Sequence, residues 1–372
     1  MAYEIVPYAA EFDPQIAQLQ THLWSGDPAR NAAYLRWKYV DNPFLDEMLI
    51  QLALFDGRVV AMRGTLGAMW QVDDVATRRL LPYADDFVVA PQHRNRGVAS
   101  QIMRASLRAA AECGFQFVLS FNASPVTFIN LLAAGWRAAG SYHAVWRNTA
   151  WTPRLERLRD RVRQTRWYGR FNAIVHALRP AGPFARLDRA AGRIAGRLSL
   201  SCEPRPQEMA DLVARLPWDG RIRHVRDADY FEWRFRNPLH DYRFLFWDDG
   251  GLRGYLVLQR YLSDRLDQGC VNIADWEASD EAVQTALLET ALHYGRFSRI
   301  QTWTVSLREP VRALLRDHGF EAAEPAGVRA RSSGLLVCRL GNTPAKEPWA
   351  LGSRDLLNIA DWDLRMLYSM AA

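Results

Sequence analysis

The stretch that decides the fold is residues 85–100, Asp85-Asp86-Phe87-Val88-Val89-Ala90-Pro91-Gln92-His93-Arg94-Asn95-Arg96-Gly97-Val98-Ala99-Ser100. Its apolar first half predicts a strand that Pro91 ends, and a basic loop then opens directly into a helix. Free N–H groups and the helix dipole make the start of a helix an anion site. Gly97 lets the backbone come close to such an anion, and Arg94 and Arg96 add positive charge. No Gly-Lys-Ser/Thr follows, so the pattern predicts a pyrophosphate cradle without nucleotide hydrolysis.

This segment resembles motif A of the GNAT N-acetyltransferases, whose loop follows the pattern Gln/Arg-x-x-Gly-x-Gly/Ala. Arg94, Gly97 and Ala99 occupy the three defined positions, and a helix end at Gly135-Trp136 follows at the expected distance. The resemblance covers most of residues 1–150 and, more weakly, 201–340. It implies an α/β (α+β) fold of two units, each a mixed, mostly antiparallel central sheet flanked by helices.

The same resemblance implies a site for acetyl-CoA or another acyl-CoA as co-substrate, and it implies no metal. The backbone of Phe87, Val88 and Val89 would pair with the pantetheine arm, and one of its N–H groups would polarise the thioester carbonyl. Asn122, at the end of the following strand, would meet the pantetheine, or would cap a turn if it is a plain strand-end residue. The pyrophosphate would lie on the loop and the first helical turn, Arg94, Asn95, Arg96, Gly97, Val98, Ala99 and Ser100.

Transfer of an acyl group to an amine requires the neutral amine, because an ammonium has no lone pair. A lysine-like amine has a pKa near 10.4, so its deprotonation at neutral pH costs about 4 kcal/mol. A carboxylate acting through water is the usual remedy. Asp85 and Asp86 lie on the predicted strand, and alternation sends them to opposite faces, so only one would face the acceptor. We expect Asp86 to be the catalytic base, with Asp85 as the alternative; otherwise both cap the strand entrance.

One position departs from the family pattern. Many GNAT enzymes place a tyrosine general acid four residues before the glycine that ends the last helix, and that position here is Leu131. The thiolate would then leave unaided, or a nearby hydroxyl would supply the proton, from Ser124, Thr127 or Tyr142.

An internal repeat predicts the two units. Residues 34–39 and the pair Asn42-Pro43 recur as residues 230–235 and the pair Asn237-Pro238. We therefore expect a domain with the acyl-CoA loop at 1–150, an Arg-rich helical linker at 151–200, a degenerate GNAT-like domain at 201–340 and a tail at 341–372. In the second unit a strand at 271–276 is followed by the acidic turn 277–281. A phosphate would be repelled there, so we expect no coenzyme A in this unit.

The charge is uneven along the chain. The formal net charge is +6, and lysine occurs only at positions 38 and 346, so arginine carries almost all of the positive charge. The linker at 151–200 holds twelve arginines against three acidic residues. It is either a connecting helical pair with a solvated arginine face or a contact for an anionic surface or lipid-linked substrate. Net charge alone does not favour a nucleic acid partner.

Three functions stay open at this point. The first is transfer from acyl-CoA to a primary amine of a small molecule or of a cell-envelope or polysaccharide precursor. The second is a Fem-like transferase that uses aminoacyl-tRNA, which does not need the pyrophosphate loop. The third is a non-catalytic protein that senses coenzyme A or a polyanion. The sequence has no apolar run of membrane-spanning length and no secretory leader, and its four cysteines are isolated, so we expect a cytoplasmic location.

Overall fold

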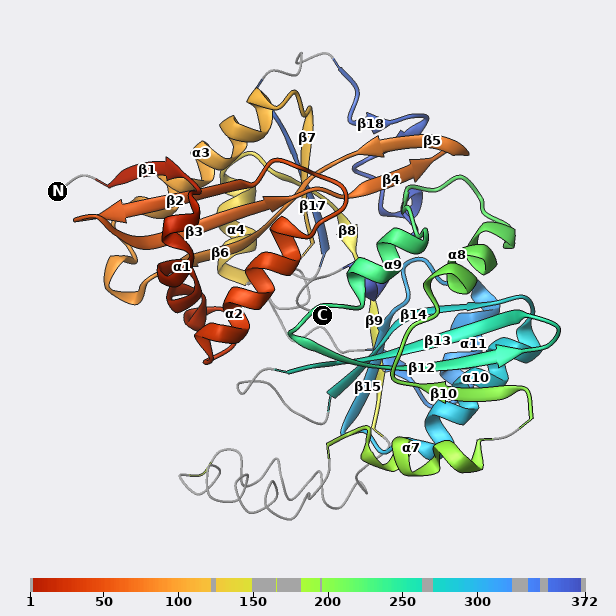
Figure 1. The fold of residues 1–372 in the computed structure, drawn as a ribbon. Helices are drawn as coiled ribbons and strands as arrows, with labels where there is room; N and C mark the ends of the chain where they lie inside the picture. The colour runs from red at the N-terminus through yellow and green to blue at the C-terminus, as the bar shows by residue number, and fades with distance from the viewer. Residues whose placement is uncertain are drawn as a thin grey trace.

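The computed structural model describes residues 3–121, 125–148, 165, 182–194, 196–262, 270–322, 334–341 and 347–368. Two seven-stranded sheets, each flanked by helices, form two units (Figure 1). Residues 366–368, the last that the structure describes, lie where the units meet. The predicted fold class is thus confirmed. Most of the linker, residues 151–164 and 166–181, lies outside the described residues. Within the described ranges, no helix is long and apolar enough to span a membrane.

The first unit alternates strands and helices as the sequence predicts. Its strands are β1 (Glu4–Pro7), β2 (Leu49–Phe55), β3 (Arg58–Leu66), β4 (Met69–Val72), β5 (Asp74–Leu80), β6 (Tyr83–Val89), β7 (Phe117–Ser120), β8 (Arg137–Ser141) and β9 (Ala144–Arg147). Its α-helices are α1 (Asp13–Leu19), α2 (Pro28–Leu35), α3 (Val98–Glu112) and α4 (Pro125–Ala133). The shorter turns are η1 (Ala10–Phe12), η2 (Gln20–His22), the π-helical η3 (Arg36–Val40) and η4 (Pro91–His93).

The second unit has a similar order of elements, but among its described residues it lacks counterparts of β4 and β5 and has a short strand, β11 (Arg223–His224), that pairs with β4. Its strands are β10 (Leu198–Ser201), β11 (Arg223–His224), β12 (His240–Asp248), β13 (Leu252–Tyr261), β14 (Cys270–Ala278), β15 (Arg299–Trp303), β16 (Glu321–Ala322) and β17 (Gly334–Arg339). Its helices are α7 (Ala185–Ala190), η5 (Ala191–Arg193), α8 (Pro206–Arg215), α9 (Ala228–Arg234), α10 (Glu281–Tyr294) and α11 (Glu309–Asp317). The chain ends in β18 (Ala350–Leu351), β19 (Arg354–Asp355), η6 (Ile359–Asp361) and η7 (Met366–Tyr368).

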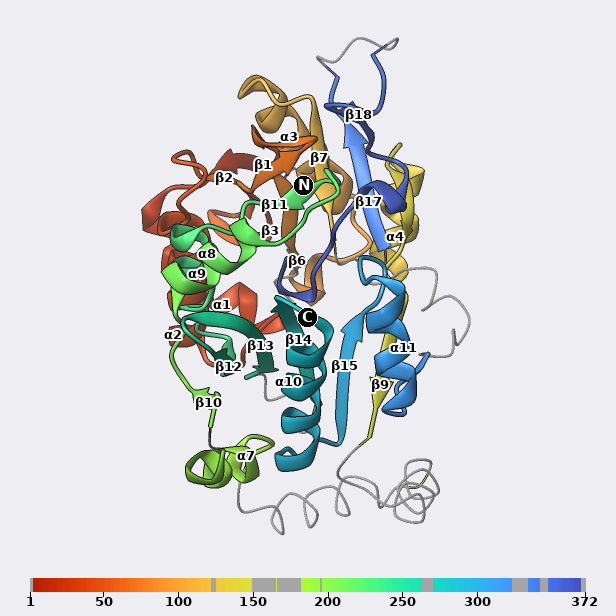
Figure 2. The ribbon, with the colours of Figure 1, turned by 90° about the vertical axis from the view of Figure 1, so that its right-hand side faces the viewer.

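The two units exchange one strand each (Figure 2). The first sheet has the order β1-β2-β3-β6-β7-β17-β8, and the second has the order β10-β12-β13-β14-β15-β9-β16. The segment from Ser141 to Trp146 does not form one strand, because β8 ends at Ser141 and β9 pairs with β15 of the other unit. The predicted ranges 1–150 and 201–340 each contain a strand of the other unit's sheet.

The repeated motifs form the interface between the units. The rings of Trp37 and Trp233 stack with centroids 5.0 Å apart and planes 10° from parallel. Each indole Nε1 donates a hydrogen bond to the backbone carbonyl of the other tryptophan, at 2.6 and 2.8 Å. Asn42 and Asn237 likewise make the same turn, each accepting a bond from the N–H two residues later. The repeat thus builds an approximately two-fold contact between buried aromatic faces.

Candidate active site

Asp86 lies at a β-bulge in β6. The register against β3 pairs Met62 with Val88 and then Gly64 with Asp85, so β6 has one extra residue here. Asp86 has a φ of 50°, which interrupts the alternation of side chains along the strand. Both carboxylates consequently reach one cation, because Lys38 Nζ donates to Asp85 Oδ2 at 2.8 Å and to Asp86 Oδ1 at 2.9 Å. The expectation of opposite faces is wrong, since it assumed a regular strand.

Asp86 is the enclosed member of this pair. Its side chain is 0% exposed, and it also accepts bonds from Trp24 Nε1 at 2.8 Å and from the Tyr39 hydroxyl at 2.9 Å. Burial raises the pKa of Asp86 above its ordinary value, although Lys38 opposes the rise. Asp85 is more open, with a side chain 16% exposed and an Oδ1 that bonds to no other described residue. Asp85, rather than the expected Asp86, therefore presents the accessible carboxylate.

The bulge also opens one edge of β6. Among the described residues, β6 pairs with β3 along most of its length but with β7 only at Tyr83 and Leu119. From Ala84 to Val89, the edge of β6 toward β7 pairs with no described strand, and we call this edge the open edge. Beside it, the nearly buried Arg63 lies 5.2 Å from the centre of the Phe87 ring. Burial lowers the pKa of Arg63. An unpaired edge offers main-chain bonds to an extended ligand.

The loop after β6 leads into an uncapped helix. Gly97 stands immediately before α3 with a φ of 79°, and no side chain caps the helix there. A Cβ added at Gly97 would meet no atom within 4 Å, so the space in front of the helix is open. The first turn of α3 holds no acidic residue. Arg94, Asn95, Arg96 and Ser100 are exposed around this opening, and Arg94 donates to the Val89 carbonyl at 3.1 Å. The loop, the helix start and the open edge are contiguous, as an anion with an extended arm requires.

Two family models match the chain, one in each unit. A model described as the acetyltransferase (GNAT) family matches residues 15–126, and one described as an acetyltransferase (GNAT) domain matches residues 223–335. Together they match more than half of the 372 residues. The chain belongs to the GNAT acetyltransferase family. No curated protein sequence matches it significantly.

Solved GNAT structures share this fold across nearly the whole chain. A GCN5-related N-acetyltransferase from Anabaena variabilis has a TM-score of 0.55 at 12% identity, covering 91% of this chain and 73% of its own. One from Kribbella flavida has a TM-score of 0.54 at 14% identity, with coverages of 91% and 72%. A tandem GNAT protein from the clavulanic acid biosynthesis pathway has a TM-score of 0.52 at 14% identity, with coverages of 92% and 100%. At these identities the likeness shows the two-unit fold.

In the second GNAT unit, the C-terminal segment of the chain occupies the place that is equivalent to the open edge of β6. β14 carries a bulge like that of β6 and pairs in parallel with β15 only from Cys270 to Asn272. Beyond that point the C-terminal segment crosses between the strands. Leu364 bonds to the Ser306 hydroxyl through both its N–H and its carbonyl, and Arg365 Nη1 donates to the Trp276 carbonyl at 3.1 Å.

The helix after β14 is also capped. Asp280 accepts a bond from the N–H of Val283 at 2.9 Å and occupies the N-terminus of α10. The acidic turn predicted from the sequence therefore lies where an anion would have to bind. Its Asp280 carboxylate already accepts a hydrogen bond from the N-terminus of the helix. Of the two GNAT units, only the first keeps both an open edge and an uncapped helix start within the described ranges.

Hydroxyls that could protonate a leaving thiolate are not equally placed. Leu131, at the family's tyrosine position, is 1% exposed in the core beneath α4. Tyr142 is also buried, donates to the Phe121 carbonyl at 2.8 Å and stacks on Trp303, and burial raises its pKa well above the ordinary value. Thr127 is half-buried in α4. Asn122 and Ser124 lie outside the described residues.

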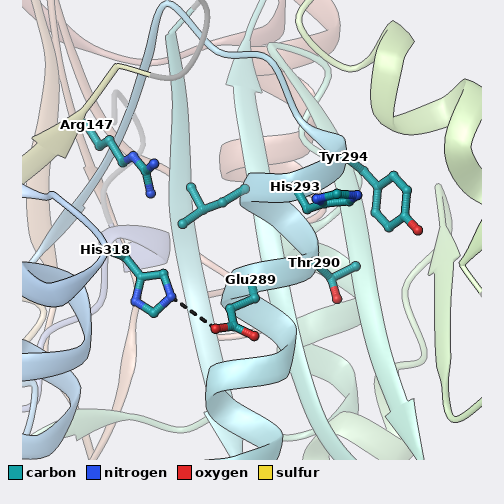
Figure 3. Close-up of a pocket in the computed structure, with 7 residues that line it drawn as sticks. Arg147, Glu289, Thr290, His293, Tyr294 and His318 are labelled. Carbon is teal, nitrogen blue, oxygen red and sulfur yellow. Dashed lines mark hydrogen bonds and ion pairs between the residues drawn. The ribbon is translucent and has the colours of Figure 1, made fainter.

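A separate depression lies in the second unit (Figure 3). It is open, has a volume of about 540 Å³, and lies between β9, α10 and the end of α11. Its lining residues are Arg147, Glu289, Thr290, Leu292, His293, Tyr294 and His318. His318 Nε2 lies 3.3 Å from Glu289 Oε1. None of the residues predicted from the sequence lines it. Within the described part of the chain, no group of three His, Cys, Asp or Glu side chains is arranged to hold a metal.

The residues that hold the two aspartates were not predicted from the sequence. Lys38, Tyr39 and Trp24 come from the α1–η3 region, far from β6 along the chain. One signal was available, since Lys38 is one of only two lysines and stands inside the repeated motif. No comparable signal in the sequence indicated that the C-terminal segment lies beside β14 of the second unit.

Proposed function

We propose that the first unit is an acyl-CoA-dependent N-acyltransferase with one donor site per chain. The observation that carries this proposal is the difference between the units. Residues 84–100 combine an open strand edge with an uncapped helix start, and the second unit fills both equivalents with its own residues. The family membership of both units supports transferase chemistry.

The residues of the first unit fit an acyl-CoA. The pyrophosphate would lie before α3, where Gly97 leaves open space and Arg94 and Arg96 add charge. The open edge of β6 would bond the amide groups of the pantetheine arm, and its N–H groups are the donors available to polarise a carbonyl. When bound, the acyl-CoA supplies a thioester whose acyl group can be transferred.

Asp85 is the group best placed to act on the acceptor. Lys38 holds one oxygen of its carboxylate, and no described residue bonds to the other oxygen, which can accept a proton. In the reaction the amine nitrogen forms the new bond to the acyl carbon, the carbon–sulfur bond breaks, and coenzyme A leaves as its thiolate. Asp85 takes the proton that the amine loses, directly or through a water, and the thiolate takes up a proton from solvent to give the free thiol. The acceptor is a primary amine of a small molecule or of a cell-envelope or polysaccharide precursor.

The test is amine-dependent release of thiol from acyl-CoA. We expect Asp85→Asn to lower the amine-dependent rate by about 100-fold or more while leaving acyl-CoA binding unchanged. Glu277→Gln is the matched control, because Glu277 is the carboxylate of β14 with the same 16% side-chain exposure. A wild-type protein that binds acyl-CoA but releases no thiol with any primary amine would favour the non-catalytic alternative. Full activity in Asp85→Asn would show that Asp85 is not the proton acceptor.

A further inference from the structure

Lys38 is a buried cation with every donor in use. Its side chain is 0% exposed, and Nζ donates to the Tyr34 hydroxyl at 3.0 Å, to Asp85 Oδ2 at 2.8 Å and to Asp86 Oδ1 at 2.9 Å. An ammonium has three protons, so the three bonds saturate it. The rings of Trp24, Tyr34 and Tyr39 surround it with centres 5.0–5.6 Å from Nζ. Its position is thus fixed on all sides.

The backbone around Lys38 explains this placement. Residues 36–40 form a π-helical turn, in which the three consecutive residues Trp37, Lys38 and Tyr39 are all buried. A regular helix turns by about 100° per residue and would not bury three neighbours in succession. π-helical turns are costly and are often found at functional sites. Here the turn sends Trp37 to the second unit and Lys38 to the bulge of β6.

We propose that Lys38 is a positioning residue that joins Asp85 and Asp86 into one proton-accepting unit whose accessible end is Asp85. This inference rests on the proposed function of the first unit. Two adjacent carboxylates and one ammonium leave a single net negative charge, so the group can take up one proton from an acceptor amine. Asp86 anchors Lys38 from the buried side, together with Trp24 and Tyr39. Lys38 in turn fixes Asp85 Oδ2 and leaves Oδ1 to face the acceptor.

Other ionisable groups around the two carboxylates do not replace Lys38. Tyr34 and Tyr39 interact with both carboxylates from the α2–η3 segment, as does Tyr83 from β6. Burial holds the pKa values of these hydroxyls well above their ordinary value, so they stay neutral. Arg63 interacts with them from β3, without a hydrogen bond to either. Lys38 is the cation in direct contact with both.

The second unit offers a matched control for burial. Arg226 is 1% exposed at its side chain and holds Asp275 at 3.0 Å and Glu277 at 2.6 Å, two carboxylates of β14. Like Lys38, Arg226 therefore binds two carboxylates of one strand, but it does so in the second unit, where the C-terminal segment occupies the strand edge. Removing Arg226 tests the loss of a buried ion pair that does not involve Lys38, Asp85 or Asp86.

The experiment measures kcat/KM for amine acylation against pH in wild type, Lys38→Met, Asp86→Asn and Arg226→Met. A nearby cation favours the charged carboxylate, and a nearby carboxylate disfavours it. Lys38→Met should therefore move the acid limb of the profile to higher pH by about 1 to 3 pH units, and Asp86→Asn should move it to lower pH. Arg226→Met should lower thermal stability and leave the limb in place. Lys38→Arg should restore part of the wild-type profile, since Arg234 fills the corresponding place in the repeat.

Two results would overturn the proposal. In the first, Lys38→Met lowers activity equally at every pH, as a merely structural role would. In the second, Lys38→Met and Asp86→Asn move the acid limb in the same direction. Either result, obtained with an active wild type, leaves the acyltransferase proposal standing. An inactive wild type would instead count against the function of the first unit. Wild-type acyl-CoA binding is measured alongside, so the two failures are distinguishable.

Discussion

Acid should loosen the interface between the units through His224. This residue is 3% exposed on β11, which pairs with β4 of the first unit. Its ring lies 4.4 Å from that of Trp70, 4.6 Å from Tyr368 and 5.0 Å from Tyr230. Its Nδ1 has no hydrogen-bond partner among the described residues. Burial, with Arg234 and Arg226 adding to it, lowers the pKa of His224 to about 3.

The sign and size of the effect follow from proton linkage. The unfolded chain takes up a proton on His224 below about pH 6.5, and the folded protein does so only near pH 3, so stability falls as the pH drops through this window. For each pH unit inside this window, the free energy of unfolding changes by about 1.4 kcal/mol. Acidification from pH 7 to pH 5 should therefore cost about 2 kcal/mol through His224 alone.

The assay is urea unfolding followed by tryptophan fluorescence at several pH values from 7 down to about 5. His224→Phe keeps an aromatic ring in the cluster and cannot be protonated. We expect its free energy of unfolding to fall less than that of wild type over this range, by about 2 kcal/mol. Other acid-sensitive groups, such as the buried His240, contribute equally to both proteins and cancel in the difference. Parallel curves for the two proteins would refute the reasoning.

Three further predictions concern the contacts between and within the units. Trp233→Ala removes one half of the reciprocal stack and leaves the Trp37 carbonyl unpaired, so it should cost about 3–5 kcal/mol of unfolding free energy, measured by urea unfolding. A fragment of residues 1–150 lacks β17, which lies between β7 and β8, and should show no cooperative thermal transition by circular dichroism; a sharp transition would argue against the exchange. Asp280→Ala removes the cap of α10 and should cost about 1 kcal/mol without changing acyl-CoA affinity in a calorimetric titration.

Local patterns predicted the framework of the first unit well. The strand before Pro91 and the helix after Gly97 both occur. Each of these depends on a few neighbouring residues, so a single sequence is enough to find them. The repeat at 34–39 and 230–235 was equally visible, and it correctly indicated two units.

Long-range pairing was not predictable in the same way. Nothing near residues 144–147 indicates that they join the sheet of the second unit, because that pairing depends on partners such as Ile300 and Trp303. The pentapeptide Asn-Ile-Ala-Asp-Trp makes the same point. At 272–276 it lies in the strand β14, and at 358–362 it forms the 3₁₀ turn η6 and the residues flanking it. Identical residues thus take different structures because their tertiary partners differ.

The two aspartates show the same limit at the site itself. Alternation predicts opposite faces, but the bulge at Asp86 turns both carboxylates to Lys38. A bulge depends on the register with β3, which the sequence of β6 alone does not contain. The sequence therefore placed two carboxylates on β6, but it did not predict which of them is accessible.

Calorimetric titration of acetyl-CoA and longer acyl-CoAs tests the central claim most directly. We expect one site per chain in wild type, and loss of that site in Gly97→Trp, whose side chain would fill the open space before α3. Thermal unfolding of the variant is measured in parallel to confirm that it is folded. Two sites per chain, no binding of any acyl-CoA to wild type, or unchanged affinity in a folded Gly97→Trp variant would contradict the account.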